Sequence, residues 1–154
     1  MSASPGAAPG PAGVPAWLSL VTLGVDDLSR ARAFYAALGW VESSVSNTDV
    51  AFFHNAGAVL SLYGRQALAA DAGVSPDGAG FRRISLAINL PSEAAVDLAF
   101  VAWAAAGGTV VKPPERVFWG GYSGYGTDPD GHLWEMAYNP GLPLSSHGRV
   151  TLPT

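Results

Sequence analysis

One pattern occurs twice in this chain of 154 residues, and it restricts the fold more than any other feature. A β-rich stretch at residues 17–25 leads into a helical pattern at 26–40, and a second β-rich stretch at 81–90 leads into another at 91–108. Short strand-like segments then follow each helical pattern. The chain therefore predicts two copies of one unit, in which a strand, a helix and about three further strands follow one another.

Capping residues mark the ends of both predicted helices. Asp27 and Ser92 precede the helical patterns and are expected to accept hydrogen bonds from the first turn, while glycines follow both patterns. Superposing Leu23 on Leu86 aligns the first strands of the two copies without a gap. The later strands are predicted at 50–54 and 58–63 in the first copy and at 109–111, 122–127 and 133–138 in the second.

Composition shifts suggest where the domain begins and ends. The first 16 residues are rich in Pro, Ala and Gly, carry no charged side chain and lack the apolar run of a signal peptide. The final residues are expected to form a second, poorly ordered tail. The predicted divisions are a disordered leader at 1–16, a single domain at 17–142 with modules at 17–63 and 81–142 joined by a linker at 64–80, and a C-terminal tail at 143–154.

Charge and composition exclude several function classes. The net charge of −4 argues against a nucleic-acid groove, which requires clustered Lys and Arg. The absence of cysteine excludes disulfides, thiolate metal sites and cysteine nucleophiles. No segment is a plausible membrane span. We therefore expect a cytoplasmic protein that binds neither nucleic acid nor membrane.

The stretch GTDPDGHLWEM at residues 126–136 predicts a hairpin with one carboxylate on its second strand. Pro129 favours the second position of a type I turn, and Gly131 suits the left-handed position that follows. Strand alternation places Glu135 on one face of the hairpin and His132 on the other. Glu135 is therefore a candidate metal ligand or catalytic residue. His132 is not expected to share a metal with it.

The repeated unit, LGVDDLSRARAFYAALGW near the start and GYSGYGTDPDGHLWEMAYNP near the end together resemble the vicinal oxygen chelate superfamily. This group includes glyoxalase I, extradiol dioxygenases, fosfomycin-resistance enzymes and bleomycin-binding proteins. The resemblance covers roughly residues 17–142 and implies an α+β fold of two βαβββ modules that form a half-open sheet cleft around the ligand. It also implies a homodimer, formed side by side or by exchange of modules, because members commonly complete their clefts by pairing.

The resemblance further locates the four positions from which metal enzymes of the superfamily take their ligands. These positions fall on Leu20, on Ser61, on Arg83 (or Arg82 if the alignment slips by one) and on Glu135. Only Glu135 has a metal-compatible side chain, and an arginine cation beside it would oppose a divalent metal. We therefore expect no cofactor and a metal-free cleft, with a divalent metal held by displaced ligands as the alternative.

Two histidines are candidates for displaced metal ligands. His54 ends a predicted strand and is expected at the rim or surface, and His132 is expected to face away from Glu135. In their place, Arg83 and Glu135 could form an ion pair across the cleft or orient a polar group of the ligand.

Aromatic residues near the cleft favour a flat, apolar or heterocyclic ligand. The segment FWGGYSGYG at 118–126 sets rings among glycines, and glycines in a strand often mark close approach of a ligand. The sequence leaves open whether Phe52 or its neighbour Phe53 faces the cleft. The predicted ligand-binding residues are Leu20, Phe52, Ser61, Tyr63, Arg83, Trp119, Tyr122 and Glu135.

Two functions from different classes remain open. The first is a glyoxalase-like or bleomycin-resistance-like protein that binds a small molecule in a metal-free cleft. The second is a lyase, isomerase or related enzyme with a displaced metal site, or with Glu135 as a catalytic general base. Against the second, no Ser–His–Asp set, paired carboxylates or ligand cluster is visible in the sequence.

Overall fold

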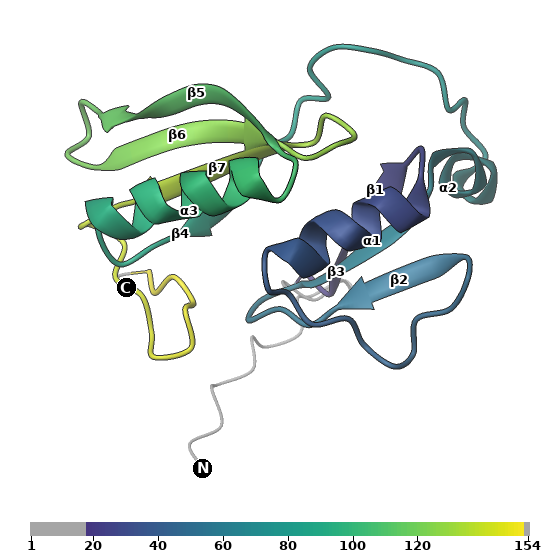
Figure 1. Cartoon of the computed structure of the whole chain (residues 1–154), viewed down its shortest axis with the longest axis horizontal. Coiled ribbons are helices and arrows are strands. Elements are labelled where there is room, and N and C mark those ends of the chain that lie inside the picture. The colour runs from purple at the N-terminus through teal and green to yellow at the C-terminus, as the bar shows by residue number, and fades with distance from the viewer. Residues whose placement is uncertain (1–17, 153–154) are drawn as a thin grey trace, which may run out of the picture.

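The computed structural model describes residues 18–152, so the leader predicted at 1–16 lies outside the described residues. The chain forms two sheets, each with a helix packed against one face (Figure 1). None of the helices within 18–152 is long and apolar enough to cross a membrane. The elements are β1 (Leu20–Val25), α1 (Leu28–Ala37), β2 (Val50–Phe53), β3 (Val59–Gly64), α2 (Arg65–Ala72), β4 (Leu86–Asn89), α3 (Glu93–Ala105), β5 (Thr109–Arg116), β6 (Tyr122–Thr127) and β7 (Leu133–Tyr138).

The two sheets repeat one topology, which confirms the predicted α+β fold of two βαβββ modules. Module 1 has the strand order β1-β3-β2, and module 2 has the order β4-β7-β6-β5. In each, the first strand pairs in parallel with the last, and the other pairs are antiparallel. Module 1 has one strand fewer because its remaining edge is reduced to an isolated bridge between Glu42 and Phe53.

Both helices begin at the predicted capping residues. The Asp27 side chain accepts a hydrogen bond from the Arg30 backbone N–H at 3.0 Å, and Ser92 Oγ accepts one from Ala95 N–H at 3.1 Å. These bonds satisfy donors that have no partner within the helix. The capping signals in the sequence therefore predicted the starts of both helices correctly.

Three segments differ from the expectations from sequence. Residues 64–80, predicted as a linker, contain helix α2, because the run RQALAADA consists mostly of good helix formers. The predicted strand at 81–90 is shorter, since β4 spans only Leu86–Asn89. In the predicted tail, a bridge between Leu144 and Val150 closes a turn, and the neighbouring Arg149 donates a hydrogen bond to the Ala56 carbonyl.

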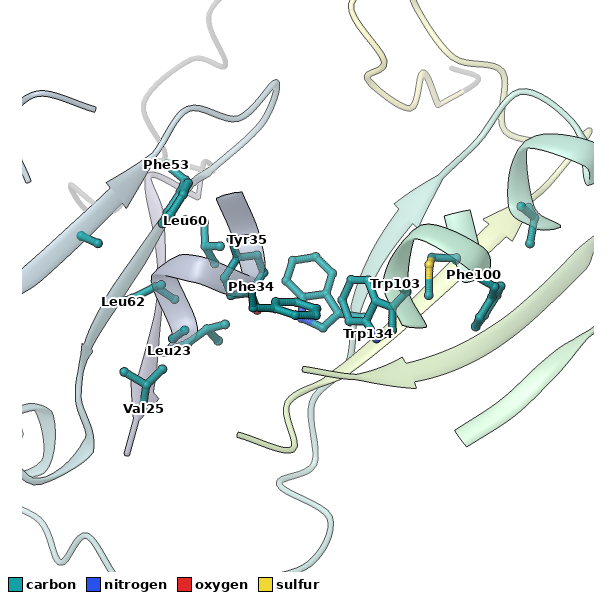
Figure 2. Packing of buried hydrophobic residues seen from close by; sticks show 14 residues of the cluster. Leu23, Val25, Phe34, Tyr35, Phe53, Leu60, Leu62, Phe100, Trp103 and Trp134 are labelled. Carbon is teal, nitrogen blue, oxygen red and sulfur yellow. The ribbon is translucent and has the colours of Figure 1, made fainter. Parts of the chain in front are cut away.

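The helix-bearing faces of the two sheets meet in one aromatic core (Figure 2). Phe34 of α1 packs edge-on against Trp103 of α3, with ring centroids 4.9 Å apart. The ring centroid of Trp134 on β7 lies 5.7 Å from that of Trp40 and 6.2 Å from that of Tyr35. Because the helix-bearing faces occupy the junction between the modules, the opposite faces of the sheets, here called the open faces, point away from it.

A buried hydrogen bond joins the two modules within this core. The Tyr35 hydroxyl donates to Asp128 Oδ2 at 2.8 Å, and both residues are almost fully buried. Asp128 also accepts hydrogen bonds from the backbone N–H groups of Asp130 and His132, and its Oδ2 lies 2.8 Å from His132 Nδ1. At the rim of the junction, Arg30 forms a 3.0 Å ion pair with Asp130.

The junction shifts the pKa values of both partners. Burial raises the pKa of the Tyr35 phenol well above its usual value, and the charge and hydrogen bond of Asp128 raise it further. Burial alone would raise the pKa of the Asp128 carboxyl, but its interactions with His132 and the Tyr35 hydrogen bond outweigh burial and lower it. The interaction therefore favours a neutral phenol and an ionised carboxylate.

Removing the buried hydroxyl should destabilise the protein. We expect Tyr35→Phe to lower the free energy of unfolding by about 1.5–3 kcal/mol, because a hydrogen bond to a charged, buried group is lost. Tyr122→Phe is the matched control, since it removes a 2.6 Å bond to Asp97 on the surface and should change stability little. Urea unfolding of both variants measures the difference. Equal effects would contradict a special role for the buried bond.

Alkaline pH should remove the advantage that Tyr35 provides. The unfolded phenol ionises near pH 10, whereas the pKa of the folded phenol is raised, so the contribution is complete below about pH 10 and declines above it. The stability difference between the wild type and Tyr35→Phe should shrink by about 1.4 kcal/mol for each pH unit above 10. Urea unfolding at about pH 8 and about pH 11 tests this. A constant difference would contradict the raised pKa.

Candidate functional site

The open face of module 1 carries a small group of polar and aromatic side chains. Leu20 and Thr22 of β1, Phe52 of β2, and Ser61 and Tyr63 of β3 share this face. Strand alternation places them there, because the residues between them pack into the core on the other face. Ser61 lies at the centre, with Thr22 opposite it on one side and Phe52 on the other.

A cavity of about 340 Å³ opens on this face, and we call it the module 1 pocket. Its floor is the strand face, one wall is the segment before and at the start of β2, and another is α2. Four of the eight predicted ligand-binding residues line it, namely Leu20, Phe52, Ser61 and Tyr63. The remaining lining residues are Thr22, Asn47, Asp49, Val50, Leu68 and Asp71.

The floor of the module 1 pocket holds a pair of hydroxyl groups. Thr22 Oγ1 and Ser61 Oγ form a hydrogen bond with each other, and Ser61 is only 1% exposed. One bond uses one of the two hydroxyl protons, so the other proton has no acceptor among residues 18–152. The pair can therefore donate a hydrogen bond to a molecule in the pocket.

The open face of module 2 carries Glu135. Ala87 of β4 and Tyr125 of β6 lie beside it on neighbouring strands, and Tyr125 occupies the place that Phe52 has in module 1. Glu135 is half-buried and makes no hydrogen bond or ion pair with another residue in 18–152. Glu135 is not among the residues that line the module 1 pocket, which contains Ser61.

The structure does not form the expected ion pair between Arg83 and Glu135. Arg83 precedes β4, is exposed and has a φ of 62°, whereas Glu135 lies in the middle of β7. The two modules align two residues away from the predicted register, because the pair Thr22–Ser61 corresponds to Ala87–Glu135. Under this register, Ser85 and not Arg83 occupies the place of Leu20.

Two of the predicted aromatic residues lie elsewhere. Tyr122 is on the helix-bearing side of β6, where its hydroxyl donates to Asp97 of α3 at 2.6 Å. Trp119 lies in the β5–β6 turn, where its ring covers Gly121, and it lines neither of the two cavities described here. The choice between the two phenylalanines is resolved, since Phe53 is fully buried in the core and Phe52 lines the module 1 pocket.

The two candidate histidines, His54 and His132, do not line the module 1 pocket. His132 pairs with Asp128 at the module junction, and His54 lines a larger cavity between the modules. Within residues 18–152, no three His, Asp or Glu side chains are grouped closely enough to hold a metal ion. Metal-independent binding therefore stays a prediction that requires a direct test.

The larger cavity, of about 1070 Å³, lies between the edge strands β1 and β4. Trp40, Trp134 and part of the C-terminal segment, Gly148–Val150, also line it. None of the eight predicted ligand-binding residues does so. We therefore assign the candidate ligand site to the smaller cavity, where predicted residues from three strands converge.

Several lining residues of the module 1 pocket were not predicted from sequence. Leu68 and Asp71 belong to α2, which was expected to be linker, and Asn47 and Asp49 belong to the connection before β2. The helix-forming run at 65–72 was the available signal for the first pair. Pattern alone gave no indication that the second pair folds over the strand face.

Comparison with known proteins agrees with this fold. The family model for the glyoxalase/bleomycin resistance protein/dioxygenase superfamily matches residues 17–136, which is most of the chain. A search of curated proteins finds no match to the chain.

Solved structures provide the second comparison. A glyoxalase-related enzyme from Fulvimarina pelagi is 34% identical, with a TM-score of 0.80 over 89% of this chain and 98% of that one. A glyoxalase/bleomycin resistance protein/dioxygenase from Nocardioides is 27% identical, with a TM-score of 0.67 over 79% of this chain and 82% of that one. A lactoylglutathione lyase from Agrobacterium tumefaciens is 26% identical, with a TM-score of 0.62 over 81% and 95%. The chain therefore belongs to the glyoxalase/bleomycin resistance protein/dioxygenase superfamily.

Proposed function

We propose that this protein binds a small, flat, apolar or heterocyclic molecule in the module 1 pocket. The observation that carries the proposal is the convergence of Leu20, Phe52, Ser61 and Tyr63 on one cavity of about 340 Å³. That volume lies within the range typical of small-molecule sites. Phe52 and Tyr63 offer aromatic surface, and the Thr22–Ser61 pair offers a hydrogen bond that orients the ligand.

The side chains at the family's metal positions support binding without a metal. Leu20 and Ser61 occupy two of them, and neither is a strong ligand for a divalent ion. In module 2 the corresponding pair is Ser85 and Glu135, of which only Glu135 is a common ligand. One carboxylate and a buried hydroxyl do not make a first coordination sphere of three or four protein ligands.

Ligand binding should depend on the aromatic floor and not on metal. A metabolite library screened by thermal shift identifies a ligand, and calorimetry then measures its affinity for the variants. We expect Phe52→Ala to weaken binding by about 1–3 kcal/mol, because a ring in contact with the ligand is lost. Trp119→Ala is the control and should leave affinity unchanged, and treatment with EDTA should change neither affinity nor melting temperature.

Other outcomes would contradict this function. A loss of affinity in Trp119→Ala but not in Phe52→Ala would move the site away from the module 1 pocket. Stoichiometric metal whose removal lowers the melting temperature would contradict the metal-free site. Turnover of the bound compound, abolished by Glu135→Gln without loss of binding, would indicate an enzyme with Glu135 as general base.

We also propose that the protein is a homodimer whose second copy joins the open faces of the two modules. β1 and β4 are edge strands, and among the described residues no strand pairs with their outer edges. Unpaired edges beside the larger cavity favour association, and a closed dimer satisfies both edges at once. Module 2 of the second copy, placed beside β1, would bring its Glu135 toward the module 1 pocket.

The mass in solution tests the dimer. Light scattering at micromolar concentration should give about twice the chain mass of 15.8 kDa. Leu18 lines the larger cavity between β1 and β4 and is 68% exposed. We expect Leu18→Lys to produce monomers, because a partner would bury the new charge. Leu98→Lys is the control, since Leu98 is 70% exposed on the outer side of α3. A wild-type mass of one chain would contradict the proposal.

A further inference from the structure

The charges around the module 1 pocket are all of one sign. Among residues 18–152, Asp49 and Asp71 are the only charged residues that line it, one from the segment before β2 and the other from the last turn of α2. Neither carboxylate forms an ion pair or a side-chain hydrogen bond with another residue in 18–152. Two carboxylates on opposite walls of an open pocket produce a negative potential at its mouth.

The arginines near these walls are already engaged. Arg32 forms a 3.0 Å ion pair with Glu42 and donates to the backbone carbonyls of Asn47 and Val50. Arg65, at the start of α2, forms a 2.9 Å ion pair with Asp26. Their charges are balanced locally, so they do not neutralise Asp49 and Asp71.

The floor of the pocket makes a different demand on the ligand. The Thr22–Ser61 pair has one hydroxyl proton that no residue in 18–152 accepts, and Thr22 is exposed, so an acceptor on a ligand can take the place of water as its partner. Phe52, Tyr63 and Leu68 also line the pocket and favour a flat apolar body. The pocket thus combines a hydroxyl pair and aromatic rings on its strand face with two exposed carboxylates on its walls.

From this arrangement we infer that the ligand is a cation: an aromatic or heterocyclic molecule whose protonated amine sits between Asp49 and Asp71 and whose ring faces Phe52 and Tyr63. The inference rests on the proposed function, because it concerns the same pocket. The two carboxylates attract an ammonium group and repel a carboxylate on an otherwise identical ring, so both effects favour a cationic ligand over an anionic one.

Three probes of nearly equal size separate charge from shape. Naphthylmethylamine is cationic at neutral pH, naphthylmethanol is neutral and naphthoic acid is anionic. Calorimetry on the wild type should show the amine binding about tenfold more tightly than the alcohol, with the acid weaker than both. Salt at about 0.5 M should remove most of the difference, because the carboxylates are exposed to solvent.

Matched variants test whether the effect is local. Asp49→Asn and Asp71→Asn should each lower the affinity for the amine about threefold and leave that for the alcohol unchanged, as expected for exposed charges. Asp77→Asn changes the net charge equally but lies outside the pocket, so it should leave all three affinities unchanged. Melting temperatures of the variants confirm that each one is folded.

The outcomes distinguish this inference from the proposed function. Equal binding of the three probes, or equal effects of Asp77→Asn and Asp49→Asn, would overturn the inference while leaving a pocket for flat molecules in place. Failure of the wild type to bind any of the probes, or binding that Phe52→Ala does not weaken, would contradict the pocket itself and the inference with it.

Discussion

The hydrogen bond between Tyr35 and Asp128 is the interaction on which the arrangement of the two modules depends. A buried carboxylate is costly unless its oxygens are satisfied, and here Tyr35, His132 and two backbone N–H groups share them. These partners come from α1 of one module and the β6–β7 turn of the other. The bond therefore holds the helix-bearing faces together in one orientation, while the surrounding rings supply most of the apolar burial.

In this orientation, the two open faces lie outside the junction between the modules. Corresponding positions also carry different chemistry, because the Thr22–Ser61 pair of module 1 is replaced by Ala87 and Glu135 in module 2. In the described part of the chain, an additional helix, α2, covers only the first of the two faces and turns a strand surface into a pocket. Membership of the superfamily thus explains the fold, whereas these differences between corresponding residues set the chemistry of each face.

The parts of the structure that depend on local signals could be predicted from sequence. Asp27 and Ser92 marked helix starts through capping, and alternation placed Ser61 and Glu135 on the correct faces. Arg83 was misplaced because a strand's first residue is set by pairing with its neighbour, so β4 begins later than its apolar pattern suggested. The packing of the modules through their helices depends on contacts between residues far apart in the sequence. The hydrogen bond between Tyr35 and Asp128, for example, joins residues 93 positions apart, and no local pattern encodes such a contact.

Helix α2 has a consequence for how proteins of this kind diverge. It contributes a single buried side chain, Ala69, to the protein interior, and its contacts are with the strands β1 and β3. Mutations in it therefore reshape one wall of the pocket at little expense to the aromatic core. The wall that α2 forms and the aromatic core are therefore encoded in separate stretches of the chain, so substitutions can alter the first while leaving the second intact.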